Sequence, residues 1–275
     1  MGNVVSSLLL VVSRVLNPSL LESSLAASKK LGHYAVLGGA ALTIIYAIYG
    51  AIKFDSFAVF AMGLGFVVAL AVAQFAAMRF LDASDTIIAN TPSRISSTAF
   101  LDCVGLLVLL FAAATLLGGI ASSIATRSAI PLLPALLFGA VLTCFGAVTL
   151  HPRTVNVVTG EGTAGEEAIG LLSFFAKAGL KLVPLLFLLF SAAGALTILM
   201  GFFGESGAFA SMANTVLSAL PMQNQVPAGL SGSALVLFAC LVPIFTYFFF
   251  LLQHLFIDVL RAVLSVPAKL DALRR

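Results

Sequence analysis

The sequence predicts an all-α, polytopic membrane protein, with six transmembrane helices arranged as three hairpins and with interfacial amphipathic helices beside them. Charged residues make up 9% of the chain, against about 25% in a soluble domain, and the mean hydropathy is +1.14. Apolar residues make up 61%, which is more than one globular core can bury. The apolar runs are long and continuous, which favours helices over a β-barrel because a helix satisfies its own backbone in hydrocarbon.

Three parts of the chain differ in composition. Residues 1–30 are predicted to form interfacial amphipathic helices, residues 31–265 a single transmembrane domain, and residues 266–275 a basic cytoplasmic tail. Six apolar runs come near the ~20 residues that about 30 Å of hydrocarbon requires. These predicted spans lie at approximately 31–52, 56–78, 103–125, 130–150, 182–204 and 233–257.

The N-terminal segment, residues 4–16, is too short to span a bilayer, and most of its polar residues share about a third of the helical circumference. We interpret it as an interfacial helix, because it lacks the basic start and the cleavage site of a signal peptide. Asn17-Pro18 restarts the chain as a second amphipathic segment. The first residues also match the pattern for myristoylation of Gly2, which we interpret as chance unless the source is eukaryotic.

Basic residues predict the orientation of the spans. Twelve of the 14 Lys and Arg residues fall on one side when both termini and the loops after the second and fourth spans share that side. They are Arg14, Lys29, Lys30, Arg79, Arg94, Arg153, Lys177, Lys181, Arg261, Lys269, Arg274 and Arg275. This asymmetry predicts cytoplasmic termini, in an integral protein of the bacterial inner membrane. The basic residues then meet anionic headgroups of the lipid bilayer, and no basic patch interleaved with aromatic residues indicates a nucleic-acid partner.

A capping box opens the stretch before the fifth span. Thr163 and Glu166 have the spacing at which each side chain satisfies the other's backbone amide. The following turns place Lys177 and Lys181 with Glu166 on one polar face, and lysines in the last turns complement the helix dipole. Pro184 then removes an amide donor and bends the path. The sequence therefore predicts an interfacial helix, a kink and an uncharged span.

Two weaker patterns concern the hairpins. Residues 209–220 repeat apolar residues at helical spacing, which predicts a further interfacial or re-entrant helix on the outer side. Residues 41–45 and 195–199 share the pattern Ala-Leu-Thr-Ile, and glycines follow both before an outer turn. The first and third hairpins are therefore candidates for a parallel repeat of the kind found in transporters. Chance recurrence in an apolar chain is the alternative explanation.

The three histidines provide the candidate cofactor site. His33 begins the first span, His151 ends the fourth and His254 lies near the inner end of the sixth, so all three are predicted in the cytoplasmic leaflet. Imidazoles at one depth can ligate haem, another tetrapyrrole or a metal ion. The alternative is that they are independent interfacial side chains, because no HxxxH or HExxH spacing supports a site, and we assign no metal ligands.

We assign no catalytic residue. Gly229-Leu230-Ser231-Gly232 resembles the GxSG nucleophile motif of rhomboid intramembrane proteases, but the resemblance covers four residues only. A serine nucleophile needs a base within hydrogen-bond reach, and His254 lies about 34 Å further along the same predicted helix. The GxGxxG and GxxxxGK[ST] motifs for nucleotide phosphates are absent from the sequence. The sequence therefore predicts that the chain is not an enzyme.

No acid or base lies deep in a predicted span. The deeper polar side chains are those of Gln74, Gln253 and several threonines. Ion-coupled transporters need ionisable groups inside the membrane, so this composition argues against an active transporter. The composition does not argue against a passive channel. The cysteines have no CxxC spacing, and we interpret them as packing residues: Cys103, Cys144 and Cys240.

The favoured function is a non-catalytic membrane component, an accessory or scaffolding subunit that binds other membrane subunits or associates with itself. The second hypothesis is a channel or transporter for a small neutral or apolar solute, built on the hairpin repeat. The third is a membrane subunit that binds a tetrapyrrole or a metal ion. Small residues let membrane helices approach closely. The candidate helix-packing positions are Gly38, Gly39, Thr43, Gly63, Gly65, Gly139, Thr143 and Gly146.

Overall fold

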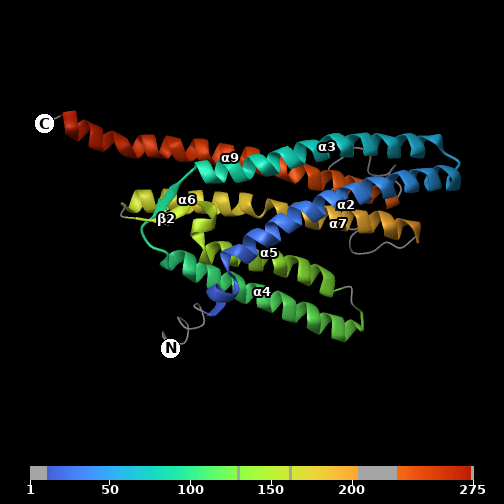
Figure 1. Ribbon diagram of the computed structural model, residues 1–275, viewed down its shortest axis with the longest axis horizontal. Coiled ribbons are helices and arrows are strands. Elements are labelled where there is room, and N and C mark those ends of the chain that lie inside the picture. Colours follow the sequence, from blue (N-terminus) through green and yellow to red (C-terminus); the bar gives the residue numbers. More distant parts are fainter. Residues whose placement is uncertain (1–10, 129–130, 161–162, 204–227, 274–275) are drawn as a thin grey trace. The chain divides into compact units, whose positions relative to one another are not determined.

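The computed structural model describes residues 11–128, 131–160, 163–203 and 228–273 (Figure 1). Its helices are α2 (Pro18–Lys53), α3 (Phe57–Asn90), α4 (Ala99–Thr126), α5 (Leu132–Leu150), α6 (Ala164–Lys181), α7 (Val183–Phe202) and α9 (Ala228–Leu273). Six helical stretches are long and apolar enough to cross a membrane, and α6 with α7 forms one of them. The predicted fold class is confirmed. The helix predicted at residues 209–220 lies outside the described residues.

Several helices are much longer than the predicted spans. α2 has 36 residues, α3 has 34 and α9 has 46, against about 20 for one bilayer crossing. The amphipathic segment predicted before residue 31 is simply the first part of α2. A change from polar to apolar side chains does not end a helix, because the backbone bonds continue until a breaker or a competing contact interrupts them. Composition therefore locates the hydrocarbon-crossing part of a helix but not its ends.

Local sequence signals mark several helix ends. Before α2, the Asn17 side-chain oxygen accepts a hydrogen bond from the Ser19 amide at 3.2 Å. The capping box of α6 is confirmed: the Glu166 amide donates to the Thr163 hydroxyl at 3.4 Å, and the Thr163 amide donates to Glu166 Oε2 at 2.8 Å. Pro184 lies in the first turn of α7, where a missing amide removes no helical bond.

Chain contacts divide the protein into two compact units. Unit 2 consists of Ser24–Asp82 and Val183–Phe245. Its helices approach closely where small residues meet: a Cβ on Gly194 of α7 would lie 2.8 Å from the carbonyl oxygen of Gly232 on α9. The Thr43 hydroxyl of α2 lies 2.8 Å from that of Ser233, also on α9. Small residues and interhelical hydroxyl bonds are the usual means of packing helices in hydrocarbon.

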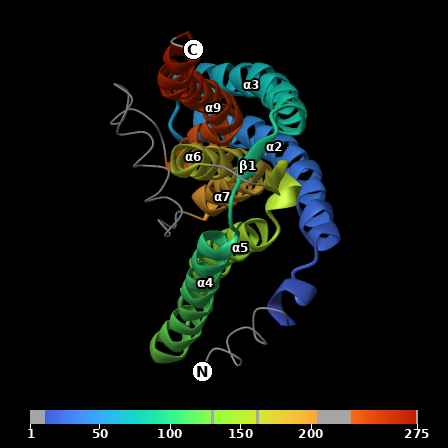
Figure 2. The same ribbon diagram turned by 90° about the vertical axis from the view of Figure 1, so that its left-hand side faces the viewer.

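Unit 1 consists of Met1–Ser23, Ala83–Leu182 and Thr246–Arg275. Its α4 and α5 form a hairpin and lie side by side (Figure 2). Gly119 of α4 leaves space for Ala135 of α5, and a Cβ on Gly119 would clash with that alanine. The Phe175 ring of α6 stacks on the Phe145 ring of α5, with centroids 6.3 Å apart. This aromatic contact fixes the hairpin against α6.

Unit 1 also contains a short parallel strand pair that the sequence analysis missed. β1 (Ser93–Ile95) pairs with β2 (Val157–Thr159). A 3-10 helix, η1 (Pro152–Val155), precedes β2, and Asn156 reverses the chain between them in the left-handed conformation, with φ 55°. Strands of three residues are too short to display a period of two, so side-chain periodicity does not reveal them.

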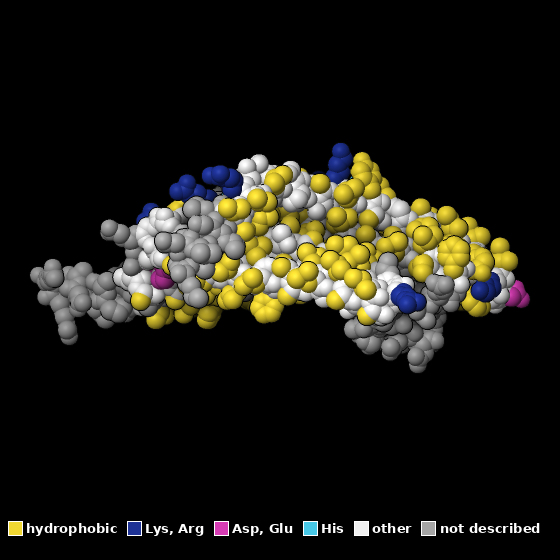
Figure 3. All heavy atoms as spheres, turned by 90° about the horizontal axis from the view of Figure 1, so that it is seen from below, with side chains coloured by type: hydrophobic (Ala, Val, Ile, Leu, Met, Phe, Trp, Pro, Cys, Tyr) yellow, Lys and Arg dark blue, Asp and Glu magenta, His cyan; other side chains and the backbone are white. Residues whose placement is uncertain are grey.

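Apolar side chains dominate the face of the molecule drawn in Figure 3. On α4, Leu110 and Phe111 are 59% and 67% exposed, and on α3, Val68 and Val72 are 60% and 67% exposed. Large apolar side chains exposed on this scale are unfavourable in water but carry no penalty in hydrocarbon. The outward faces of the long helices therefore fit a membrane protein.

Candidate functional site

The candidate site is a group of short elements in unit 1 that surrounds Lys177, and we call it the Lys177 cap. It comprises the end of α3 from Ala83, β1, η1, β2 and α6. All charged residues of the stretch from α6 to α7 lie in α6, whereas Val183–Phe202 contains none. We therefore expect α7 to make the membrane crossing of this stretch, with α6 outside the hydrocarbon.

Lys177 is fully buried, at 0% exposure. Its ammonium donates to the Thr91 backbone oxygen, to Ser93 Oγ at 2.6 Å and to the Asn156 backbone oxygen at 3.3 Å. Three acceptors match the three donors of an ammonium group, which is how a buried charge without a carboxylate partner is stabilised. Burial, and after it the charge of Arg261 on α9, lower the pKa of Lys177 from 10.5 to about 8, so it stays mainly protonated at neutral pH.

Only part of the polar face predicted for α6 is exposed. Glu166 is exposed, as expected, but Lys177 is buried against the two strands. Gly170 lies on the same side, and a Cβ there would clash with the Arg94 carbonyl oxygen of β1. The Glu167 carboxylate accepts a hydrogen bond from the Ser96 amide, and this bond lowers the pKa of Glu167. Periodicity does not distinguish a polar face in water from one that binds buried carbonyl groups.

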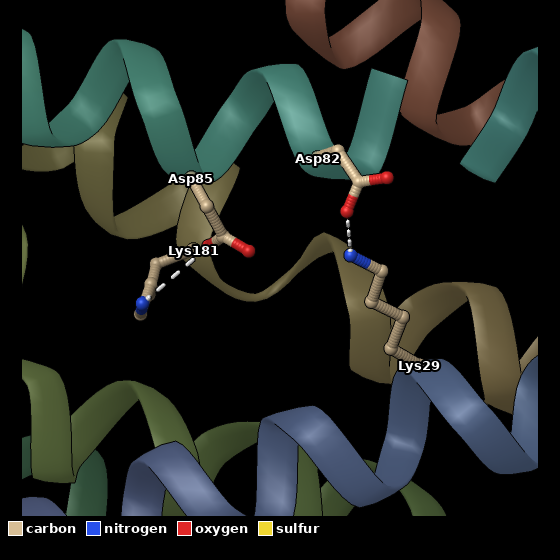
Figure 4. Close-up of polar contacts among 4 residues, drawn as sticks. All are labelled: Lys29, Asp82, Asp85 and Lys181. Atoms are coloured by element: carbon tan, nitrogen blue, oxygen red, sulfur yellow. Dashed lines mark hydrogen bonds and ion pairs between the residues drawn. The ribbon is translucent and has the colours of Figure 1, made fainter. Parts of the chain in front are cut away.

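Two further contacts hold the end of α3 in the cap. Asn156 Nδ2 donates to the Ala89 backbone oxygen at 2.7 Å. Lys181 forms an ion pair with Asp85 at 3.6 Å (Figure 4). Because Asp85 is more than half exposed, this pair contributes at most about 1 kcal/mol. The buried bonds of Lys177 therefore dominate the cap.

Unit 2 has its own ion pair, between Lys29 of α2 and Asp82 of α3, which Figure 4 also draws. His33 of α2 lies one turn further along the same helix, and its Nδ1 is 2.7 Å from Nε2 of Gln74 on α3. The same amide nitrogen donates to the His33 backbone oxygen at 3.4 Å. With an amide donor opposite Nδ1, the proton of a neutral His33 ring resides on Nε2.

The other two histidines belong to unit 1. His151 Nε2 donates to the Ser13 backbone oxygen at 3.2 Å. His254 packs on the Phe250 ring, with centroids 4.1 Å apart. Among the described residues, no group of three or more His, Cys, Asp or Glu side chains could hold a metal ion. His33 and His151 thus have hydrogen-bond partners, whereas among the described residues His254 Nδ1 is buried without one. Ligation of a tetrapyrrole stays a prediction.

Most of the predicted helix-packing positions contact helices of the same chain. Four glycines face a side chain of a neighbouring helix: Gly39 meets Val236, Gly63 meets Ala47, Gly139 meets Leu116 and Gly146 meets Leu109. The Thr43 and Thr143 hydroxyls donate to backbone oxygens one turn earlier on their own helices. Gly38 and Gly65 differ from the rest, because a Cβ on either would meet no atom within 4 Å. These two positions remain open toward the surroundings.

Two of the polar side chains that could line a solute path, Gln74 and Thr197, form hydrogen bonds within the chain. Gln74 contacts His33, and the Thr197 hydroxyl, at 3% exposure, donates to the Ala193 backbone oxygen at 2.9 Å. Gln253 lies on the part of α9 that belongs to unit 1. Neither Gln74 nor Thr197 therefore presents an unsatisfied donor to a solute.

The geometry of α9 rules out His254 as a base for Ser231 of the GxSG sequence. α9 runs without a break from Ala228 to Leu273, so Ser231 and His254 lie on one continuous helix. At 1.5 Å per residue they are about 34 Å apart, far beyond the reach of a proton transfer.

Comparison of the chain with protein-family models, with curated proteins and with solved structures found no match. Sequence reasoning missed the burial of Lys177 and the role of Ser93 and Asn156 as its acceptors. Asn156 carried the strongest available signal, because asparagine tolerates the left-handed conformation and the following Val157-Val158 favours a strand.

Proposed function

We propose that this protein is a non-catalytic integral membrane component, an accessory or scaffolding subunit that associates with other membrane helices. An open stripe of small residues on α3 supports this most directly: Ala61, Gly65 and Ala69 follow one another at intervals of four. Ala61 and Gly65 are exposed, and the space beside Gly65 is empty. Small residues at this spacing allow a second helix to approach closely in hydrocarbon, where dispersion contacts drive association.

The use of the buried polar groups also supports a structural role. Lys177 binds backbone and hydroxyl oxygens of its own chain, and Thr43 and Ser233 bind each other across two helices. Such bonds rigidify a fold because removal of one partner leaves the other buried and unsatisfied. A rigid membrane bundle with an open packing stripe suits a scaffold better than a solute carrier.

We further propose that the protein resides in the bacterial inner membrane with both termini in the cytoplasm. The support is the distribution of basic residues, of which twelve of 14 fall on the side of the termini. In this orientation the Lys177 cap faces the cytoplasm.

The test is purification from source-cell membranes in a mild detergent, followed by native mass measurement. We expect a complex of fixed stoichiometry, with a second copy of the chain or with another membrane subunit. Gly65→Leu fills the stripe and should dissociate this complex. Gly118→Leu on α4 is the matched control, because Gly118 also has no atom within 4 Å of a Cβ, and it should leave the complex intact. A wild-type protein that purifies only as a monomer overturns the proposal.

A further inference from the structure

The N-terminal segment is attached to the end of α5 by one of the histidines. Residues 11–15 are helical, and the Leu16 amide donates to the Val12 backbone oxygen at 2.8 Å. His151, directly after α5, donates from Nε2 to the Ser13 backbone oxygen at 3.2 Å. Both belong to unit 1. His151, a candidate cofactor ligand, thus positions this segment.

The outer side of the segment is apolar. Val11 and Val15 are each 63% exposed, and Leu20 is 60% exposed, whereas Leu21 is buried. Val11 and Val15 are one turn apart and share a face, and Arg14 lies beside them on the helical circumference. An exposed apolar face with a basic side chain at its edge is typical of a helix that lies in the interface of a bilayer.

The charge beside this face is positive. Arg14 and Arg153 are both exposed, and neither side chain forms an ion pair or hydrogen bond with the described part of the chain. Arg153 follows His151 by two residues, so the Ser13–His151 bond brings the two arginines to one region. A guanidinium group binds phosphate oxygens through paired N–H donors. The two charges are therefore complementary to a phosphodiester.

We propose that residues 11–20 and Arg153 form a binding surface for anionic phospholipid. In this surface, Arg14 and Arg153 bind the headgroup phosphate, and Val11 and Val15 enter the boundary between headgroups and acyl chains. Zwitterionic phospholipid carries a compensating cation and binds less strongly. The surface does not depend on the scaffolding role and would exist in a monomer.

The test is a titration of the full-length protein in detergent with phosphatidylglycerol or phosphatidylcholine of matched chains, with bound lipid counted by native mass measurement. We expect preferential retention of phosphatidylglycerol. The double variant Arg14→Gln/Arg153→Gln should bind it roughly tenfold or more weakly, since each basic group contributes near an anionic surface. Val11→Ser/Val15→Ser should also weaken binding, although the charge is unchanged.

Arg127→Gln is the matched control, because Arg127 is an exposed arginine at the C-terminal end of α4 and should not affect lipid retention. His151→Leu should weaken binding by releasing the segment, and His151→Gln should restore it because the amide keeps an N–H donor. Equal retention of the two lipids by the wild type overturns the proposal. So does an equal loss in Arg127→Gln, or full displacement of the lipid by inorganic phosphate, which would indicate a site for free phosphate.

Discussion

Among single residues, Lys177 shows most clearly how a local pattern and a tertiary contact differ. Its place in the polar periodicity of α6 was readable from the sequence, as was the Thr163–Glu166 capping box, because both depend on residues within a few turns. The acceptors of its hydrogen bonds could not be predicted from the sequence. Thr91 and Asn156 lie 86 and 21 residues away, and a buried ammonium depends on such distant carbonyl groups.

The lowered pKa of Lys177 predicts a pH dependence of stability. The folded chain has a pKa of about 8 at this group, whereas the unfolded chain keeps the ordinary value of 10.5. Between these values the unfolded chain binds more protons, so the free energy of unfolding rises with pH through this window. Lys177→Met should remove that rise. Thermal unfolding of the two proteins in detergent on either side of pH 8 measures it, and identical pH profiles would contradict the assignment.

Among the helices, α6 shows that a glycine lets a neighbouring strand approach the helix backbone closely. Gly170 and Gly179 have the same intrinsic helix propensity. A Cβ on Gly170 would meet a backbone oxygen of β1, whereas a Cβ on Gly179 would meet no atom within 4 Å. The helix itself was predictable from its cap and its period. The strand pair against which it packs was not, because three-residue strands have no readable pattern.

Alanine at these two glycines should have opposite effects. Gly170→Ala forces a methyl group against the Arg94 carbonyl oxygen, and we expect a loss of about 1–3 kcal/mol. Gly179→Ala removes backbone entropy from the unfolded chain without a clash, and we expect a gain of about 0.5–1 kcal/mol. Thermal unfolding of both variants in the same detergent is the measurement. Equal shifts in one direction would mean that β1 does not contact α6 at Gly170.

For the whole molecule, composition and charge predict six crossings and an orientation, and the six long apolar helices agree with the number of crossings. The division into two compact units was not predicted. The boundary between the units falls inside α2, α3 and α9, so each of these helices has one part in each unit. A helix that extends through both units has no break in its apolar pattern at the boundary, so the sequence carries no mark of it.

The orientation itself is testable with reporter fusions. A reporter attached after the basic tail, residues 266–275, should be active only in the cytoplasm, because basic residues near membrane ends are retained there. A reporter inserted in the turn between α2 and α3, at Asp55, should be active only outside. A tail accessible from outside would reverse the orientation of the whole chain, and the cap with it.

The sequence by itself determined that this protein is a bundle of membrane-crossing helices, where its hydrophobic stretches lie and how its α6 helix begins. These features follow from composition and from neighbours within one or two turns. Only the tertiary structure decided that Lys177 is buried, that Gly170 contacts a strand and that His151 holds the N-terminal segment. Each of these features depends on contacts between groups that are far apart in the chain. A sequence pattern records only separation along the chain, so it does not show which distant groups meet in space.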